Sequence, residues 1–149
     1  MRAVVQRVSR AEVRVGERPT GTIQAGLCVL LGVHVGDQAA DATMIAQKIA
    51  GLRIFADPDG LMNLSVGETR GGVLLISQFT LYGDARKGRR PSFITAAKED
   101  LALPLYELVG RTIADAGIQV AYGEFGADME VELINDGPVT ILLDSQRLF

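Results

Sequence analysis

The chain has 149 residues, of which 48% are hydrophobic and 22% are charged, so we expect a single globular domain over residues 1–149 with little disorder. The net charge of -3 excludes a protein held on nucleic acid mainly by its overall charge. The single cysteine, Cys28, excludes an internal disulfide and a zinc site built from several cysteines.

The first part of the chain is rich in expected strands. Alternating apolar residues predict a strand over Arg2–Val15 that bends or bulges near Ser9–Arg10, where the alternation breaks. Thr20–Ile23 is expected to be a short return strand. The nearly continuous apolar run Leu27–Val35 predicts a strand that is buried on both faces.

The middle of the chain combines a helix with another buried strand. Helical spacing of apolar residues predicts a helix that is capped by Asp37 or Asp41 and ends near Leu52. The apolar run Val73–Ile76 predicts a buried strand, and its carboxyl end delivers the polar segment Ser77–Thr80.

The last part of the chain contains a loop, a second helix and two closing strands. Tyr82–Pro91 is polar and basic, and we expect a mobile loop there. Apolar spacing predicts a helix over Asp100–Ala116, followed by strands at Met129–Ile134 and Val139–Leu143. Many strands and two main helices without regular alternation favour an α+β domain with a curved, barrel-like β-sheet.

Two short segments stand out as candidates for chemistry. Ser77-Gln78-Phe79-Thr80 places two hydroxyls and an amide where a buried strand ends. Asn135-Asp136-Gly137-Pro138-Val139-Thr140 places a glycine and a proline between two apolar runs, where main chain rather than side chain can face a ligand. From the residues alone, the favoured interpretation of Gly137-Pro138 is an ordinary trans turn.

Basic residues gather in one short stretch, where Arg86, Lys87, Arg89 and Arg90 surround Gly88. Such a cluster can neutralise a few phosphates even on an acidic protein, and it is also typical of a solvated loop. Composition leaves both interpretations open.

The residues that most often build hydrolytic sites are scarce. The single histidine, His34, lies in an apolar stretch away from any serine or acid motif, so we expect it to be structural. Asp57, Asp59, Asp84 and Asp128 are scattered through turns without histidine or cysteine partners, so we expect no metal, no cofactor and full activity in a chelator. No apolar run approaches the roughly 18 residues that cross a bilayer, which predicts a cytoplasmic protein.

Several motifs together resemble those of a known family. The two segments above, with Val5-Gln6-Arg7-Val8, Arg90-Pro91-Ser92-Phe93 and Gly123-Glu124-Phe125-Gly126-Ala127-Asp128-Met129, resemble the D-aminoacyl-tRNA deacylase (D-tyrosyl-tRNA(Tyr) deacylase) family in order and spacing over nearly the whole chain. The resemblance implies a proofreading enzyme that hydrolyses the ester of D-aminoacyl-tRNA to free D-amino acid and tRNA. It also implies a homodimer with two active sites at the subunit interface.

The same resemblance implies a role for each motif. The catalytic segment is Ser77, Gln78, Phe79 and Thr80, and Phe125 and Met129 hold the terminal adenosine. For the basic stretch, contact of Arg86, Lys87, Arg89 and Arg90 with the tRNA is the interpretation that fits such a substrate. Phe125 offers an aromatic face and Met129 an adaptable thioether, although their spacing alone would suggest only core packing.

The resemblance also implies that the Gly137-Pro138 peptide is cis, enters the partner's pocket and is oriented by Arg7. A D-aminoacyl group would point its side chain out of that pocket, whereas an L-aminoacyl group would drive its β-carbon into the Gly-cisPro wall. Glycine has no side chain to exclude, so glycyl-tRNA, including glycine mischarged on tRNA(Ala), is expected to be cleaved.

Two questions stay open from the sequence. Thr80 could act as a nucleophile, although neither it nor Ser77 has an evident activating partner. Alternatively, the ribose hydroxyl of the tRNA could assist water, with backbone N–H groups near Phe79 and Thr80 stabilising the oxyanion. Two other functions also fit parts of the sequence: a non-catalytic nucleic-acid-binding dimer, and an esterase for small D-amino acid esters.

Overall fold

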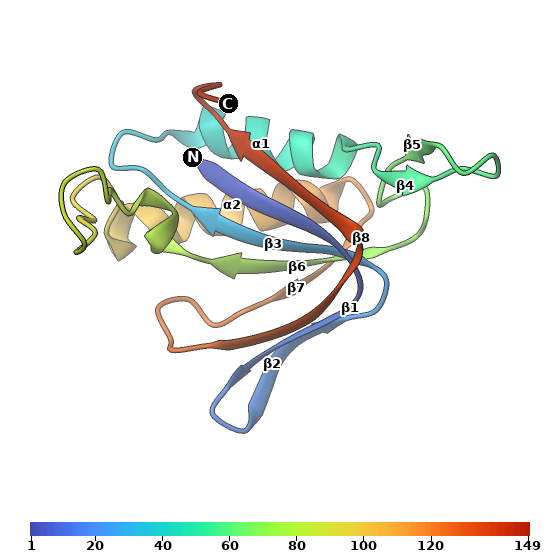
Figure 1. Cartoon of the computed structure of the whole chain (residues 1–149), viewed down its shortest axis with the longest axis horizontal. Coiled ribbons are helices and arrows are strands. Elements are labelled where there is room, and N and C mark those ends of the chain that lie inside the picture. Colours follow the sequence, from blue (N-terminus) through green and yellow to red (C-terminus); the bar gives the residue numbers. More distant parts are fainter.

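A mixed six-stranded sheet carries two helices on one of its faces (Figure 1). The structure, a computed structural model, describes residues 1–149. The strand order is β2-β1-β3-β6-β7, and β8 pairs with the opposite edge of β1. The sheet strands are β1 (Arg2–Val15), β2 (Arg18–Ile23), β3 (Gly26–Gly32), β6 (Gly72–Ser77), β7 (Gln119–Tyr122) and β8 (Glu130–Asp144). The helices are α1 (Ala39–Gly51), α2 (Glu99–Asp115) and the short 3-10 helix η1 (Phe79–Tyr82), and β4 (Phe55–Ala56) pairs with β5 (Met62–Leu64) in a separate ribbon. The predicted α+β class with a curved sheet is confirmed.

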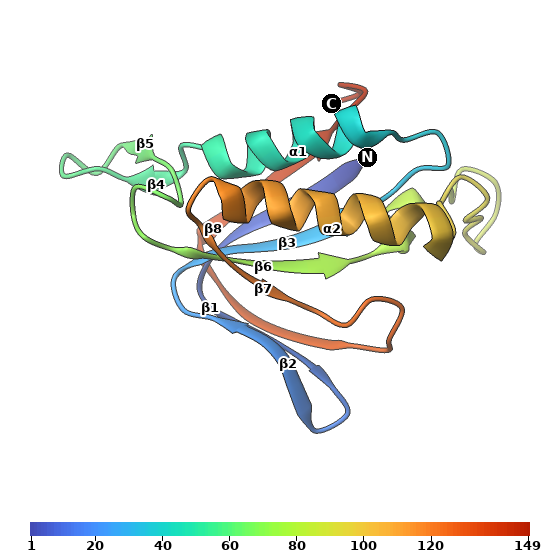
Figure 2. The same ribbon diagram turned by 180° about the vertical axis from the view of Figure 1, so that it is seen from behind.

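The parallel part of the sheet explains where the helices lie. Strands β3, β6 and β7 run parallel, whereas β1 is antiparallel to all of its neighbours. Parallel neighbours need a crossover connection, and α1 and α2 supply the two crossovers, from β3 to β6 and from β6 to β7. Both helices cover the same face (Figure 2). The carboxyl ends of β3 and β6 therefore open side by side at one edge.

Strand β1 bends as its sequence predicts. Its first half, Arg2–Val8, pairs with β3, and its second half, Ala11–Val15, pairs with β2. On its other edge, the register with β8 shifts twice, between Gln6 and Val8 and between Val8 and Arg10. Such shifts bend a strand and increase its twist. As a result, β1 and β8 curve together (Figure 1).

The main core lies between the helices and the sheet. Helix α1 buries Ala42, Ile45, Ala46 and Ile49 against this core. Helix α2 buries a similar apolar face and ends before Gly117, whose φ of +82° suits glycine. Each fully buried large aliphatic side chain contributes roughly 1.5–3 kcal/mol to folding, so these faces fix both helices on the sheet.

The start of α1 differs from the sequence prediction. The residue at its N-cap is Gln38, not Asp37 or Asp41. Asp41 lies inside the first turn, where its carboxylate accepts a hydrogen bond from the Gln38 N–H at 2.9 Å. Asp37 is buried and instead accepts hydrogen bonds from the Met1 amino group at 2.6 Å and from the His34 N–H at 2.6 Å. Contacts distant in sequence therefore draw Asp37 away from the helix.

The predicted end of the third strand is also wrong. Strand β3 stops at Gly32 rather than Val35, because its parallel partner β6 pairs only as far as Leu31 opposite Ser77. Strand β7 was not predicted, since its four residues carry no clear alternation.

The two closing strands predicted at Met129–Ile134 and Val139–Leu143 are one continuous strand, β8, along β1. Gln6 pairs with Thr140 and Val8 pairs with Asn135. One residue of β1, Arg7, therefore faces four residues of β8, Asp136–Val139. The expected turn is a wide bulge within a paired strand, because the long β1 holds both of its flanks.

Side chains of β8 support this bulge. The Asn135 Oδ1 atom accepts a hydrogen bond from the Val139 N–H at 2.8 Å, and Asn135 Nδ2 donates to the Thr140 hydroxyl at 3.2 Å. Pro138 lacks an N–H and is tolerated because it lies in a bulge of an edge strand.

Candidate active site

A cavity of about 490 Å³ opens at the carboxyl end of β6. Its wall comes from the ends of β3 and β6, from η1, from the start of α2 and from the segment between β7 and β8. All four residues of Ser77–Thr80 line it, together with Phe125 and Met129. Segments nearly fifty residues apart therefore meet at one place, as is common where parallel strands end.

The segment Ser77–Thr80 turns sharply from β6 into η1. The Gln78 N–H donates to the Leu31 carbonyl at 2.7 Å, which ties the turn to β3. The Gln78 side-chain amide donates to the Thr80 hydroxyl at 3.1 Å. The first N–H groups of a helix have no partner within it, and Phe79 and Thr80, the first two residues of η1, both line the cavity. The Phe79 ring is 57% exposed and packs edge-on against Phe93, with centroids 5.2 Å apart.

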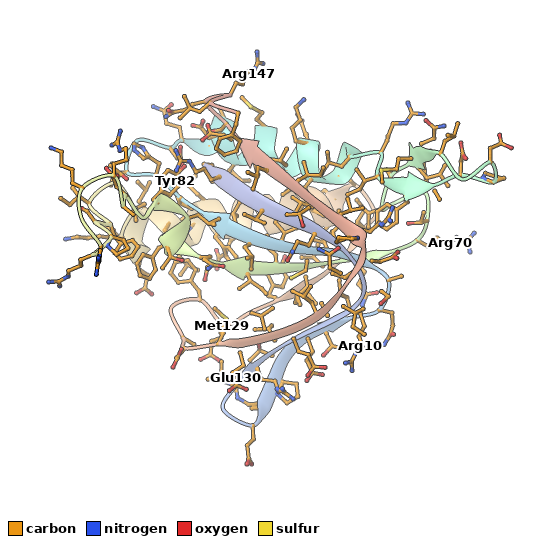
Figure 3. The ribbon with its side chains drawn as sticks, in the orientation of Figure 1. Arg10, Arg70, Tyr82, Met129, Glu130 and Arg147 are labelled. Atoms are coloured by element: carbon orange, nitrogen blue, oxygen red, sulfur yellow. The ribbon has the colours of Figure 1, made fainter.

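Aromatic packing supports the other wall of the cavity. The rings of Phe125 and Tyr106 meet edge-to-face at 5.6 Å, and the buried Tyr106 hydroxyl donates to the Leu75 carbonyl at 2.7 Å. Burial raises the pKa of Tyr106, so this hydroxyl stays protonated. The Met129 sulfur lies 2.8 Å from where a β-carbon of residue 123 would be, so Gly123 leaves room for this side chain. Met129 is labelled in Figure 3. This wall of the cavity is apolar, and Phe125 packs on a tyrosine, Tyr106, that its own hydrogen bond holds in place.

The charge of the cavity was not foreseen from the sequence. Glu99 and Asp128 line it, and no lysine, arginine or histidine does. Neither carboxylate forms an ion pair. Sequence reasoning did not single out Glu99 and Tyr106, and it expected Asp128 only in a turn. A phosphate group is therefore unfavourable inside this cavity, and phosphates of a nucleic acid need another surface.

Gly137 and Pro138 lie on β8 and do not line the cavity of their own chain. The peptide bond between them is cis, and φ of Gly137 is +139°. Arg7 braces the segment: its Nε donates to the Asp136 carbonyl at 3.0 Å and its Nη1 donates to the Ile54 carbonyl at 2.5 Å. The Arg7 side chain is only 14% exposed. The Arg7 guanidinium, bonded to the Asp136 and Ile54 carbonyls, thus fixes the position of Gly137 and Pro138.

The four basic residues Arg86, Lys87, Arg89 and Arg90 are exposed in the loop after η1, outside the first cavity. Asp84 and Ser92 close the base of this loop with two backbone hydrogen bonds of 2.8 and 2.9 Å. Arg86 pairs with Asp84 at 2.7 Å, and hydrogen bonds from Arg86 hold the pKa of the Asp84 carboxyl well below its usual range. Three basic side chains therefore remain without an ion-pair partner on this loop.

His34 does not belong to the first cavity. Its Nδ1 accepts a hydrogen bond from the Gly36 N–H at 3.0 Å, and its ring lies 5.2 Å from the ring of Tyr82. No group of three or more histidine, cysteine, aspartate or glutamate residues is arranged to hold a metal ion. Neither helix has the length and apolarity of a membrane span.

Fold and site together define a class of protein: a small α+β enzyme with a substrate-sized cavity, strand-end hydroxyls and an aromatic wall, beside an exposed basic loop. The chain matches, over residues 4–144, the family described as D-Tyr-tRNA(Tyr) deacylase. It belongs to that family. Proteins named D-aminoacyl-tRNA deacylase from Anaeromyxobacter dehalogenans (strain 2CP-C) and Thermotoga petrophila (strain RKU-1) are 60% and 54% identical to it over 149 residues, covering 100% of this chain and 100% of each relative.

Two solved structures are similar in fold. A structure described as the c-Myc DNA Unwinding Element Binding Protein superposes with a TM-score of 0.90 at 38% identity, covering 97% of this chain and 98% of that one. A structure described as a probable eukaryotic D-amino acid tRNA deacylase superposes with a TM-score of 0.81 at 17% identity, covering 95% and 97%, and shows the shared fold. The family predicted from the sequence is confirmed, and with it the enzyme class of the relatives, hydrolases that act on aminoacyl-tRNA.

Proposed function

We propose that the protein hydrolyses the ester bond of D-aminoacyl-tRNA, releasing a free D-amino acid and tRNA, and rejects the L-aminoacyl ester. The observation that carries the proposal is the meeting of Ser77–Thr80 with Phe125 and Met129 around one cavity. The terminal adenosine binds against Phe125 and Met129, which offer an aromatic face and a polarizable thioether. The ester then lies near the hydroxyls of Ser77 and Thr80.

The geometry favours attack by water rather than by Thr80. The observed partner of the Thr80 hydroxyl is a neutral amide of Gln78, which cannot take up a proton. No histidine or lysine lines the cavity to serve as a base. An aminoacyl ester is already activated, so positioning and oxyanion stabilisation by the first N–H groups of η1 suffice, and the neighbouring ribose hydroxyl of the tRNA assists the water.

The active unit in this proposal is a homodimer. Gly137 and Pro138 are exposed on the outer strand β8 and are missing from the cavity of their own chain. The same strand exposes Val131, Ile134 and Leu142 by 38%, 53% and 55%, a series of apolar side chains that a second copy can cover. In the dimer, the Gly137-Pro138 element braced by Arg7 enters the partner's cavity.

This element selects the chirality of the aminoacyl group. The backbone at Gly137 forms a wall without a side chain, so an L-configured β-carbon collides with it and a D-configured one points away. Glycine carries no β-carbon, so glycyl-tRNA, including glycine mischarged on tRNA(Ala), is also a substrate. Arg86, Lys87, Arg89 and Arg90 contact tRNA phosphates outside the cavity, and the enzyme works in the cytoplasm where aminoacyl-tRNA is used.

The test is deacylation of matched substrates. D-tyrosyl-tRNA should be hydrolysed and glycyl-tRNA should follow, whereas L-tyrosyl-tRNA and a free D-tyrosine ethyl ester should be left nearly intact. Equal rates on the D- and L-esters contradict the proposal, and preference for the free ester assigns the protein to small-ester hydrolysis.

A second candidate is binding of nucleic acid without catalysis. It is supported by the DNA-binding description of the solved structure that is 38% identical. Tight binding of uncharged tRNA or DNA without any deacylation identifies this function.

A further inference from the structure

A second cavity, of about 470 Å³, lies beside the first. Neighbouring residues line the two cavities: Val33 and Thr80 line the first, whereas the following residue His34 and the nearby Tyr82 line the second. Consecutive Cα atoms are about 3.8 Å apart, so the edges of the two cavities approach each other at Val33 and His34. A chain of nucleotides leaving the first cavity can reach the second directly.

Tyr82 gives the second cavity a hydroxyl that a ligand can reach. It was expected in a mobile loop, but it ends η1 and is only 7% exposed. No fully buried side-chain oxygen or nitrogen lacks a hydrogen-bond partner, yet the Tyr82 hydroxyl has none, so this hydroxyl reaches the cavity that Tyr82 lines. Burial raises the pKa of Tyr82 and keeps its hydroxyl a donor. Figure 3 labels this residue.

Arg2 and His34 lie next to Tyr82, and both have planar side chains that donate hydrogen bonds. The guanidinium carbon of Arg2 lies 4.7 Å from the centre of the Tyr82 ring, and Arg2 Nη1 donates to the Leu81 carbonyl at 3.2 Å. Because His34 Nδ1 accepts the Gly36 N–H, the neutral imidazole carries its hydrogen on Nε2. The cavity thus combines planar side chains with two donors that have no partner in the protein.

The charges of the second cavity cancel. Arg2 pairs with Asp144 at 3.0 Å and Arg86 pairs with Asp84 at 2.7 Å, and all four residues line the cavity. Because these two pairs leave no net charge, they offer no electrostatic attraction to a phosphate, whereas an uncharged ligand rich in acceptors needs none. The cavity therefore favours a neutral polar ring over an anion.

We propose that the second cavity binds the base of the cytidine that precedes the terminal adenosine of tRNA. This assignment rests on the proposed function, in which the first cavity holds that adenosine. Proteins read single-stranded RNA ends by stacking bases on aromatic rings or guanidinium planes and by hydrogen bonds to their edges. Cytosine presents two neighbouring acceptors, O2 and N3, to the Tyr82 hydroxyl and the His34 Nε2–H, whereas N3 of uracil carries a hydrogen.

Binding is tested by NMR on the single histidine of the chain, His34. The dinucleotide CpA should shift the resonances of the two carbon-bound imidazole protons of His34. Adenosine and inorganic phosphate should leave these resonances in place. Tyr82→Phe should weaken the CpA response, and the matched control Tyr122→Phe, outside both cavities, should not. No shift with CpA, an equal shift with adenosine, or a shift with phosphate overturns the proposal.

Kinetics supply the second test, with D-tyrosyl esters of adenosine and of CpA as substrates. The added cytidine should raise kcat/KM. Tyr82→Phe should lower kcat/KM of the CpA ester by about 2- to 13-fold, as expected for one hydrogen bond, and should leave that of the adenosine ester unchanged. Replacing the cytidine with uridine should also reduce the gain. Equal losses on both esters, or no gain from cytidine, contradict the proposal. If neither D-ester is cleaved in preference to its L-form, the proposed function fails. The NMR measurement of CpA binding at His34 still decides whether the second cavity binds cytidine.

Discussion

Replacing Thr80 with valine removes one hydroxyl and keeps the branched shape of the side chain. In the structure this hydroxyl accepts one hydrogen bond, from the Gln78 amide at 3.1 Å. If Thr80 only orients the ester and the water, its removal costs one neutral hydrogen bond, about 0.5–1.5 kcal/mol. That corresponds to a deacylation rate lower by about 2- to 13-fold. Loss of a covalent nucleophile would instead cost on the order of 10⁴-fold or more.

The assay is single-turnover hydrolysis of D-tyrosyl-tRNA with saturating enzyme. Gln78→Leu is the matched variant, because it breaks the same hydrogen bond from the other side and should slow the reaction by a similar factor. The double variant should be little worse than either single one, since both remove one shared interaction. Thermal unfolding of each variant controls for folding. A ten-thousandfold loss confined to Thr80→Val, or an acyl-enzyme recovered after acid quenching, would refute the orienting role.

Three further predictions follow from other contacts. Gly137→Ala should lower the free energy of unfolding by about 1–3 kcal/mol, because φ is +139° and the new β-carbon would lie 2.7 Å from a Val139 methyl group. It should also reduce the ratio of the D-ester rate to the L-ester rate. An unchanged melting temperature and an unchanged rate ratio would contradict this prediction. Tyr106→Phe removes one of two hydrogen bonds to the buried Leu75 carbonyl, which keeps the one from the Gly123 N–H at 3.0 Å, so urea denaturation should show a loss of about 0.5–1.5 kcal/mol, and a wild-type midpoint would count against the Tyr106 hydrogen bond. Burial raises the pKa of Cys28 to about 11, so at pH 8 only about one thiol in a thousand is ionised, and a thiol reagent should label the protein only after denaturation; rapid labelling of the folded protein would show an exposed thiol.

The sequence by itself determined the local structure of this protein. The 3.6-residue repeat of apolar residues predicted both ends of α2 to within one residue of their observed positions, since a helix is stabilised by neighbours along the chain. The apolar run before Ser77 predicted that the segment Ser77–Thr80 follows the end of a strand, and in the structure it does. Motif spacing was specific enough to predict the family. The bend in β1 could also be predicted, because its alternation breaks where the register with β8 shifts.

Only the tertiary structure decided which distant segments meet. Arg7 faces four residues of β8, and the supposed turn at Gly137-Pro138 is a bulge in one long strand, because the pairing of β1 overrides the local turn signal. The second cavity joins Arg2, His34 and Tyr82, whose separate positions in the sequence give no sign of a shared site. Periodicity reports which face of an element is buried, whereas sheet register and crossover connections set the neighbours across space, and those depend on the whole chain at once.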